Sequence, residues 1–250
     1  MDTNQTNAHT ITCFGVNLSI NNDNELRSFI GSVTPNPKWE TDLESYYSVP
    51  LINFDHYKKN CSKLSSLKNR VFADYEWELL KDKWDTIKTS LNIDSPQNLD
   101  DIKNIYQGVT EVLFPLFDEK WKKVKAEKKK DNTSENERSY PRPFAEINRL
   151  FVGFNKDLCP IIDDNSIKAL IEELRDAGYV ELDDDDKILK VSQEDGGWLI
   201  RSKMVSELFN KFMGDKNEYQ IKTIPWICLQ KLKDKRLQSL LENNRNVILT

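Results

Sequence analysis

The residues of this chain best suited to chemistry are lysines gathered near its middle. Residues 120–130, KWKKVKAEKKK, hold seven lysines and one tryptophan. Lysine ammonium groups bind phosphate oxygens, and an interleaved aromatic ring can stack on an exposed base. This spacing predicts a nucleic-acid contact made by Lys120, Trp121, Lys122, Lys123, Lys125, Lys128, Lys129, Lys130, Arg138, Tyr140 and Arg142. The alternative is a solvated helix end, because lysines in the last turns of a helix complement its dipole.

Patterns for catalysis and metal binding are missing from the sequence. It has no H-E-x-x-H, no G-x-S-x-G and no glycine-rich phosphate loop, and among its eight glycines only Gly196 and Gly197 cluster. Asp55 precedes His56, but neighbours on a helix do not face each other. The four cysteines never approach C-x-x-C spacing, and only two histidines accompany them. We therefore expect no catalytic residues, no cofactor and no metal in this chain.

Composition limits the remaining classes of function. A net charge of −5 and a pI near 5.3 disfavour nucleic-acid binding over the whole surface, so such a contact must lie on one face. No run of about 18 apolar residues occurs, which predicts a protein without a membrane span. Cys13, Cys159 and Cys228 sit among apolar neighbours, as free core cysteines do. We expect a reducing compartment and a cytoplasmic location.

Hydrophobic periodicity predicts the elements that position the lysines. Residues 10–20 form a strand by their β-branched content, bulged at Gly15. Apolar residues recur at intervals of three and four residues through 62–91 and again through 99–116, which predicts two long helices. Because the link between them is short, we expect them to pack as an antiparallel pair. Pro115 should kink or interrupt the second of these helices.

The fold class is mainly α with a few short strands, divided into two units. Residues 1–130 form an N-terminal helical unit, the candidate recognition domain, and the polar segment 131–139 is a linker. A second helical unit covers 140–233 and contains a β-hairpin at 179–191. Its predicted helices are 144–153, 166–177 and 198–213, the last one after the glycine pair. Residues 234–250 add a further helix and a short strand.

The hairpin and the helix before it resemble the wing and recognition helix of a winged helix. Asp163 or Asp164 caps the helix, and Gly178 ends it. The tip of the hairpin is four aspartates, residues 183–186, which DNA phosphates would repel. The unit is therefore winged-helix-like in shape, and its charges favour packing or protein contact over DNA reading. A calcium loop is disfavoured because the run lacks spaced ligands and a closing glutamate.

The last stretch, residues 237–250 (LQSLLENNRNVILT), carries a resemblance to a known family. It predicts a helix with one apolar side, a stop at Asn243-Asn244 and a short strand at 247–249. The stretch resembles the strand before the Walker A loop of AAA+ ATPases and is most similar to McrB-type restriction NTPases. A weaker similarity to that family covers 151–232. The alternative is an edge strand that closes an ordinary domain.

This resemblance implies the N-terminal region of an McrB-like AAA+ NTPase, cut just before the Walker A loop. In that family the N-terminal region recognises DNA, often with a modified base, while the motor hydrolyses GTP or ATP with magnesium, self-associates and recruits an McrC-like nuclease subunit. The leading hypothesis is a non-catalytic DNA-recognition and coupling region of a restriction system in anti-phage defence. The alternative is a protein-interaction module that senses a phage component or a nuclease partner without binding nucleic acid.

Overall fold

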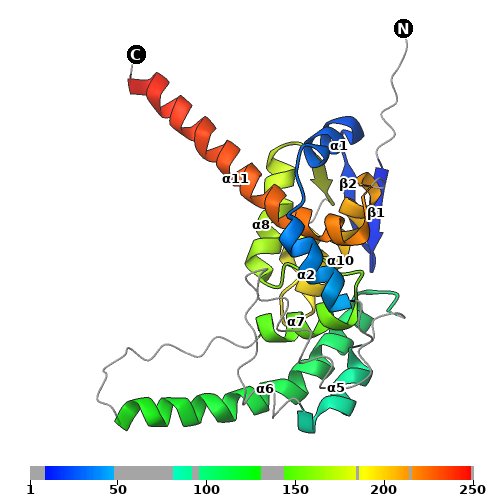
Figure 1. The fold of residues 1–250 in the computed structure, drawn as a ribbon, viewed down its shortest axis with the longest axis vertical. Coiled ribbons are helices and arrows are strands. Elements are labelled where there is room, and N and C mark those ends of the chain that lie inside the picture. Colours follow the sequence, from blue (N-terminus) through cyan, green and yellow to red (C-terminus); the bar gives the residue numbers. More distant parts are fainter. Residues whose placement is uncertain are drawn as a thin grey trace.

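The protein is mainly helical and contains one three-stranded antiparallel sheet, which confirms the predicted fold class. The computed structural model describes residues 9–47, 81–91, 96–183, except for 131–143, then 186–213 and 216–248. The elements are β1 His9–Cys13, β2 Val16–Ile20, α1 Asp23–Gly31, α2 Pro37–Tyr47, α5 Trp84–Ser90, α6 Leu99–Lys130, α7 Phe144–Phe154, α8 Asp164–Asp176, β3 Val180–Leu182, α9 Lys187–Lys190, α10 Gly197–Phe212 and α11 Glu218–Ile248. Figure 1 shows the sheet and α1 at one end of the molecule and α5 at the other.

The predicted single strand at 10–20 is wrong, because this segment is a hairpin. β1 pairs antiparallel with β2, with Cys13 opposite Val16. The two residues between them, Phe14 and Gly15, have φ angles of 53° and 76°. Two successive positive φ values define the tight turn whose twist matches that of the flanking strands, and glycine adopts this conformation without strain.

The predicted hairpin at 179–191 is also wrong. β3 pairs with β2, where Leu182 lies opposite Leu18, while Lys187–Lys190 forms the short helix α9. The Asp183 carboxylate accepts a hydrogen bond from the Lys187 backbone N–H at 2.8 Å, and Asp186 takes a left-handed conformation. These local contacts start a helical turn, so the chain does not return as a strand. The described residues therefore form no wing.

Three predicted helices of the second unit are confirmed. α7 covers the predicted segment near 144–153, and α10 begins at Gly197, the second glycine of the pair. α8 begins after Asp163, whose side chain accepts a hydrogen bond from the Ser166 backbone N–H at 2.8 Å. The chain leaves α8 at Gly178, whose φ of 77° suits glycine.

Two long helices pass through prolines without ending. α6 continues without interruption through Pro115 to Lys130, and α5 packs beside it. Most of the helix predicted at 62–91 lies outside the described residues. α11 continues through Pro225 to Ile248, so the predicted stop at Asn243-Asn244 and the strand through Val247 and Ile248 are wrong. A strand needs a neighbour to bond its backbone groups, whereas a continuing helix bonds them within the segment.

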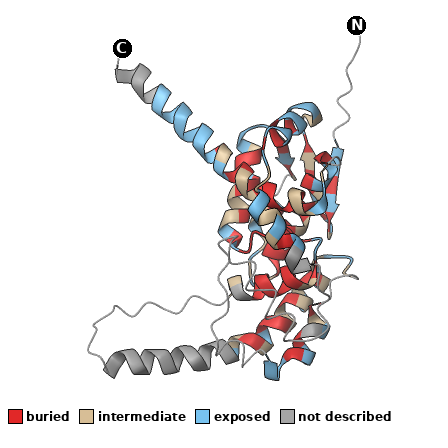
Figure 2. Ribbon diagram, viewed as in Figure 1, coloured by how far each residue is buried: buried red, intermediate tan, exposed pale blue. Residues whose placement is uncertain are grey.

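Buried side chains from both predicted units share one core. β2 of the first unit and β3 of the second lie in the same sheet, β1 packs on α10, and α11 packs on α2 and α8. Figure 2 shows buried residues running through the body from the sheet towards α5 and α6. Core members include Leu18, Leu26, Ile102, Tyr106, Leu170, Trp198 and Cys228. The proposed linker at 131–139 lies outside the described residues, and a boundary there stays a prediction.

Candidate functional site

The predicted nucleic-acid-binding lysines lie on one helix. Lys120, Trp121, Lys122, Lys123, Lys125, Lys128, Lys129 and Lys130 all fall within α6, although their side-chain positions are not described. Arg138, Tyr140 and Arg142 lie outside the described residues. The same helix buries Ile102, Tyr106, Val109 and Leu113 in the core. The lysine run is therefore continuous in backbone with a helix that is anchored in the protein body.

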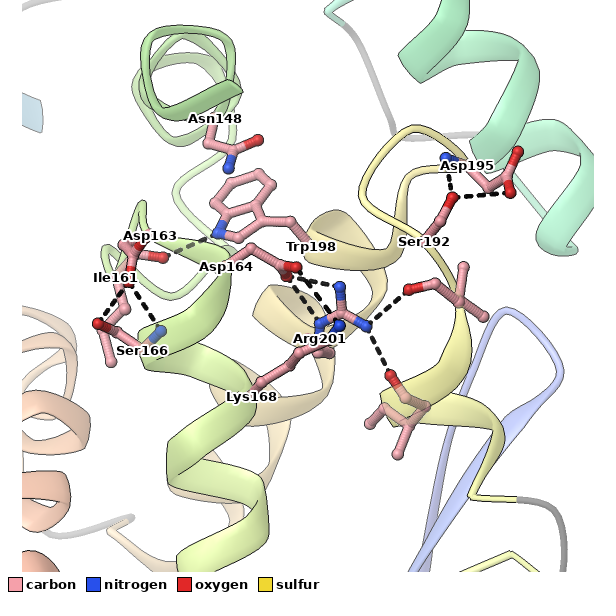
Figure 3. A network of polar contacts seen from close by, with 12 residues as sticks. Asn148, Ile161, Asp163, Asp164, Ser166, Lys168, Ser192, Asp195, Trp198 and Arg201 are labelled. Atoms are coloured by element: carbon pink, nitrogen blue, oxygen red, sulfur yellow. Dashed lines mark hydrogen bonds and ion pairs between the residues drawn. The ribbon is translucent and has the colours of Figure 1, made fainter. Parts of the chain in front are cut away.

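A buried ion pair lies between α8 and α10, and the sequence patterns did not indicate it. The Arg201 Nη2 and Nε atoms donate to Asp164 Oδ1 at 2.5 and 2.9 Å, and Nη1 donates to the carbonyls of Ile188 and Val191 at 2.7 and 3.1 Å. The side chains of Arg201 and Asp164 are 0% and 8% exposed. Figure 3 shows the guanidinium enclosed by these acceptors. Because the pair is closed to solvent, its role is to hold α8, α9 and α10 together.

Neighbouring side chains fix the chain that leads into α8. The indole N–H of Trp198 donates to the Ile161 carbonyl at 2.9 Å, and the Asn148 side chain donates to the Ile162 carbonyl at 2.8 Å. The Tyr106 hydroxyl donates to Asn148 Oδ1 at 2.6 Å, and burial raises the pKa of this hydroxyl above its ordinary range. These bonds satisfy polar groups inside an apolar core, so the network is structural and rigid.

The glycine pair makes the close approach to Arg201 possible. A Cβ at Gly197 would lie 2.3 Å from the Val191 carbonyl oxygen and 2.7 Å from Arg201 Nη2. Gly196 has a φ of 80°, and a Cβ there would lie 2.7 Å from Ile102 Cγ2 of α6. Gly196 and Gly197 therefore serve packing in a place where sequence alone showed only a chain break.

The thiols in the described residues are core side chains, as predicted. Cys13, Cys159 and Cys228 are buried and unbridged, and burial is the main cause that raises the pKa of each thiol to about 12. A thiol with such a pKa stays protonated at neutral pH and is a poor nucleophile. The fourth cysteine, Cys61, and the histidine His56 lie outside the described residues.

Lys222 is a buried cation on the first part of α11. Its Nζ atom lies 3.4 Å from the Leu158 carbonyl oxygen, and the residue is 8% exposed. Desolvation lowers the pKa of its ammonium group to about 8, and the negative neighbours Glu218 and Asp157 counteract part of this shift. A lowered pKa accompanies some catalytic lysines, but burial against a carbonyl in the core equally produces it.

The two described residues of the acidic run 183–186, Asp183 and Asp186, make local structural contacts. Asp183 bonds the start of α9, and Asp186 Oδ2 lies 3.9 Å from Arg175 Nη1. Within the described ranges, no group of three or more histidine, cysteine, aspartate or glutamate side chains is placed to hold a metal ion.

None of the helices in this part of the chain combines the length and apolar character needed to cross a membrane.

The described residues thus form a mainly helical protein with a small antiparallel sheet and a buried ion pair between α8 and α10. Searches against protein-family models, curated proteins and solved structures found no match to this chain.

Proposed function

We propose that this protein is a non-catalytic DNA-recognition and coupling region, which contacts the phosphate backbone through the lysine-rich end of α6. The observation that carries the proposal is the continuity of α6 from its buried first half into the lysine run 120–130. A flexible tail could bind DNA without affecting the body. In α6, by contrast, a displacement of the lysine-rich end would be transmitted along a continuous helix to the residues that pack against its buried first half.

The spacing of the lysines supports a backbone contact. In a helix, positions three and four apart lie on one side, so 122, 125 and 129 share a side of α6. A stripe of cations suits a row of phosphates, and such a contact is independent of base sequence. The chain as a whole carries a charge of −5, so this local concentration of positive charge would orient bound DNA towards α6.

Attachment to an NTPase motor is part of the proposal and rests on the sequence of 237–250 alone. The helical conformation of 243–248 removes the strand that the resemblance implied for this segment. A G-x-x-x-x-G-K-[ST] loop encoded shortly after Thr250 would support the motor, and a different continuation would remove that part of the proposal. The recognition function in α6 is tested separately.

The direct test is fluorescence anisotropy of labelled duplexes, with and without a modified cytosine, over a series of salt concentrations. We expect affinity to fall as salt rises, because bound phosphates exchange counterions for lysines. Changing Lys122, Lys125 and Lys129 to Glu should weaken binding by about tenfold or more and should reduce the salt slope by about 1 for each lysine that contacts a phosphate.

A matched control separates a local contact from an effect of net charge. The exposed residues Lys38, Lys83 and Lys187 lie on or beside three other elements, and changing all three to Glu alters the net charge equally. This variant should keep most of the wild-type affinity. Equal losses in the two variants, or a binding curve indifferent to salt, would refute DNA binding through α6.

A further inference from the structure

β1 is an outer strand of the sheet, and one of its two long edges is unpaired. The strand order is β1-β2-β3, and Figure 1 shows β1 at the outer margin of the sheet. Cys13 and Val16 flank the two-residue turn and form a hydrogen-bonded pair, and such pairs alternate along an antiparallel ladder. The backbone N–H and C=O groups of Thr10 and Thr12 therefore point away from β2. Among the described residues, no group bonds to them.

This edge lacks the features that usually protect an exposed strand. Proteins keep such strands very short or place lysine, proline or a bulge on them. β1, HTITC, contains neither lysine nor proline, and its five residues pair with β2 in an unbroken register. The opposite outer strand, β3, has three residues, its exposed middle residue is Glu181, and Asp183 follows it directly. The sheet thus has one protected edge and one edge that can accept a further strand.

The free edge of β1 is complementary to itself. If a two-fold axis passes between the Ile11 residues of two copies, the β1 strands run antiparallel and Thr10 of each copy lies opposite Thr12 of the other. Both threonines present their backbone groups at this edge, so the facing residues can exchange both hydrogen bonds. Their side chains are exposed and uncharged, and threonines that face each other across strands stabilise the pair. Ile11 would face Ile11 on the side that packs on α10.

We propose that β1 is an interface between two copies of this chain, which join their sheets in the order β3-β2-β1-β1-β2-β3. A second copy is the favoured occupant because it supplies a matching side chain at each of the central positions, threonine to threonine and isoleucine to isoleucine. One strand pair is a small contact, so the association is weak and depends on concentration. The proposal does not rest on DNA binding through α6, since it concerns different residues.

Sedimentation velocity of the full chain, from about 10 to 500 µM, tests for the dimer, because a weak interface populates it in this range. Hydrogen exchange of single amides, measured by NMR at both ends of the range, tests for the edge. The Thr10 and Thr12 amides should exchange quickly in the monomer and about tenfold or more slowly in the dimer. The Ile11 amide, which bonds to β2, should be protected at both concentrations.

Variants locate the contact on β1. Thr10→Lys with Thr12→Lys should weaken the dimer by about tenfold or more, because lysines of the two copies would face each other. Thr12→Pro should do the same by removing an N–H that points away from β2, and proline is tolerated at such a position of an outer strand. Both variants should keep the circular dichroism spectrum of wild type. Glu181→Lys on β3 changes the net charge as much as the two lysines do, and it should dimerise like wild type.

Four results would overturn the proposal. A chain that stays monomeric throughout the concentration range has no such interface, and a dimer unaffected by the lysine and proline variants uses another surface. Equal weakening in Glu181→Lys would assign the loss to net charge. If the protein stays monomeric but a peptide of residues 8–14 carrying Cys13→Ser protects the Thr10 and Thr12 amides, the edge accepts a strand from a different partner.

Discussion

Two of the buried cations, Arg201 and Lys222, differ in the contacts that surround them. Arg201 is enclosed by a carboxylate and two carbonyls, which compensate its desolvation. Lys222 has the Leu158 carbonyl at 3.4 Å, and its pKa is lowered chiefly by burial. The difference follows from donor geometry, because a guanidinium presents several donors in a plane to fixed acceptors and an ammonium is a compact, strongly hydrated charge. Lys222 is therefore one of the residues through which pH should act on stability.

The contribution of Lys222 to the stability of the fold should rise with pH in the alkaline range. Its pKa is about 8 in the folded protein and 10.5 ordinarily, so between these values the unfolded chain binds more protons. The contribution of Lys222 to the unfolding free energy should then increase as pH rises from 8 to 10.5, by roughly 3 kcal/mol. The buried thiols, whose pKa values are raised to about 12, contribute in the opposite direction above about pH 9, but they are the same in wild type and in a Lys222 variant. Urea unfolding of wild type and Lys222→Met across this range measures the contribution of Lys222. The difference between the unfolding free energies of the two proteins should narrow as pH rises. A difference that stays constant with pH would contradict the prediction.

At the scale of the element, α8, α9 and α10 depend on one ion pair. The Asp164 carboxylate at the start of α8 and the carbonyls at the end of α9 meet the same guanidinium from α10 (Figure 3). Gly197 has room for only a hydrogen beside that guanidinium. A larger residue at position 197 would displace the arginine that joins the three helices, so the ion pair requires a glycine there.

Arg201→Met should therefore be severely destabilising. It leaves Asp164 buried without its partner, and breaking a buried pair in this way costs about 3 to 5 kcal/mol. Lys103→Met removes an ion pair with Asp195 whose side chains are 45% and 42% exposed, and this control should cost less than about 1 kcal/mol. Urea unfolding at neutral pH compares the two variants with wild type. Similar small losses in both would show that Arg201 does not stabilise the fold.

The elements that sequence predicts well are those governed by local rules. The Asp163 cap, the stop at Gly178 and the apolar spacing of α8 are all readable within a few residues. The strand that pairs with β3 cannot be predicted in this way. The alternation of apolar and polar residues in 180–182 does not show that the neighbouring strand, β2, lies more than 150 residues earlier in the chain. Arg201 was missed for the same reason, since its partners lie on α8 and in α9.

At the scale of the molecule, α6 and α11 are two long helices whose first parts are packed in the core. α6 contributes Ile102 and Tyr106, and α11 contributes Cys228 and Leu229. Sequence could place both helices but could not show that they belong to one packed body. The apparent boundary at 131–139 rests on composition, whereas the sheet and the core combine residues from before and after it.

A body held by one sheet and one core should unfold as a unit. Leu18 of β2 is 1% exposed and lies opposite Leu182, so Leu18→Ala creates a cavity exactly where the two predicted units join, at a cost of about 2 to 5 kcal/mol. If the units fold together, calorimetry should show one transition, and the substitution should move that transition as a whole. Far-ultraviolet circular dichroism and tryptophan fluorescence should give the same midpoint. Two transitions, with only the lower-temperature one shifted in Leu18→Ala, would instead show that the two units unfold independently, and DNA binding at α6 could then not be passed to the second unit through a shared core.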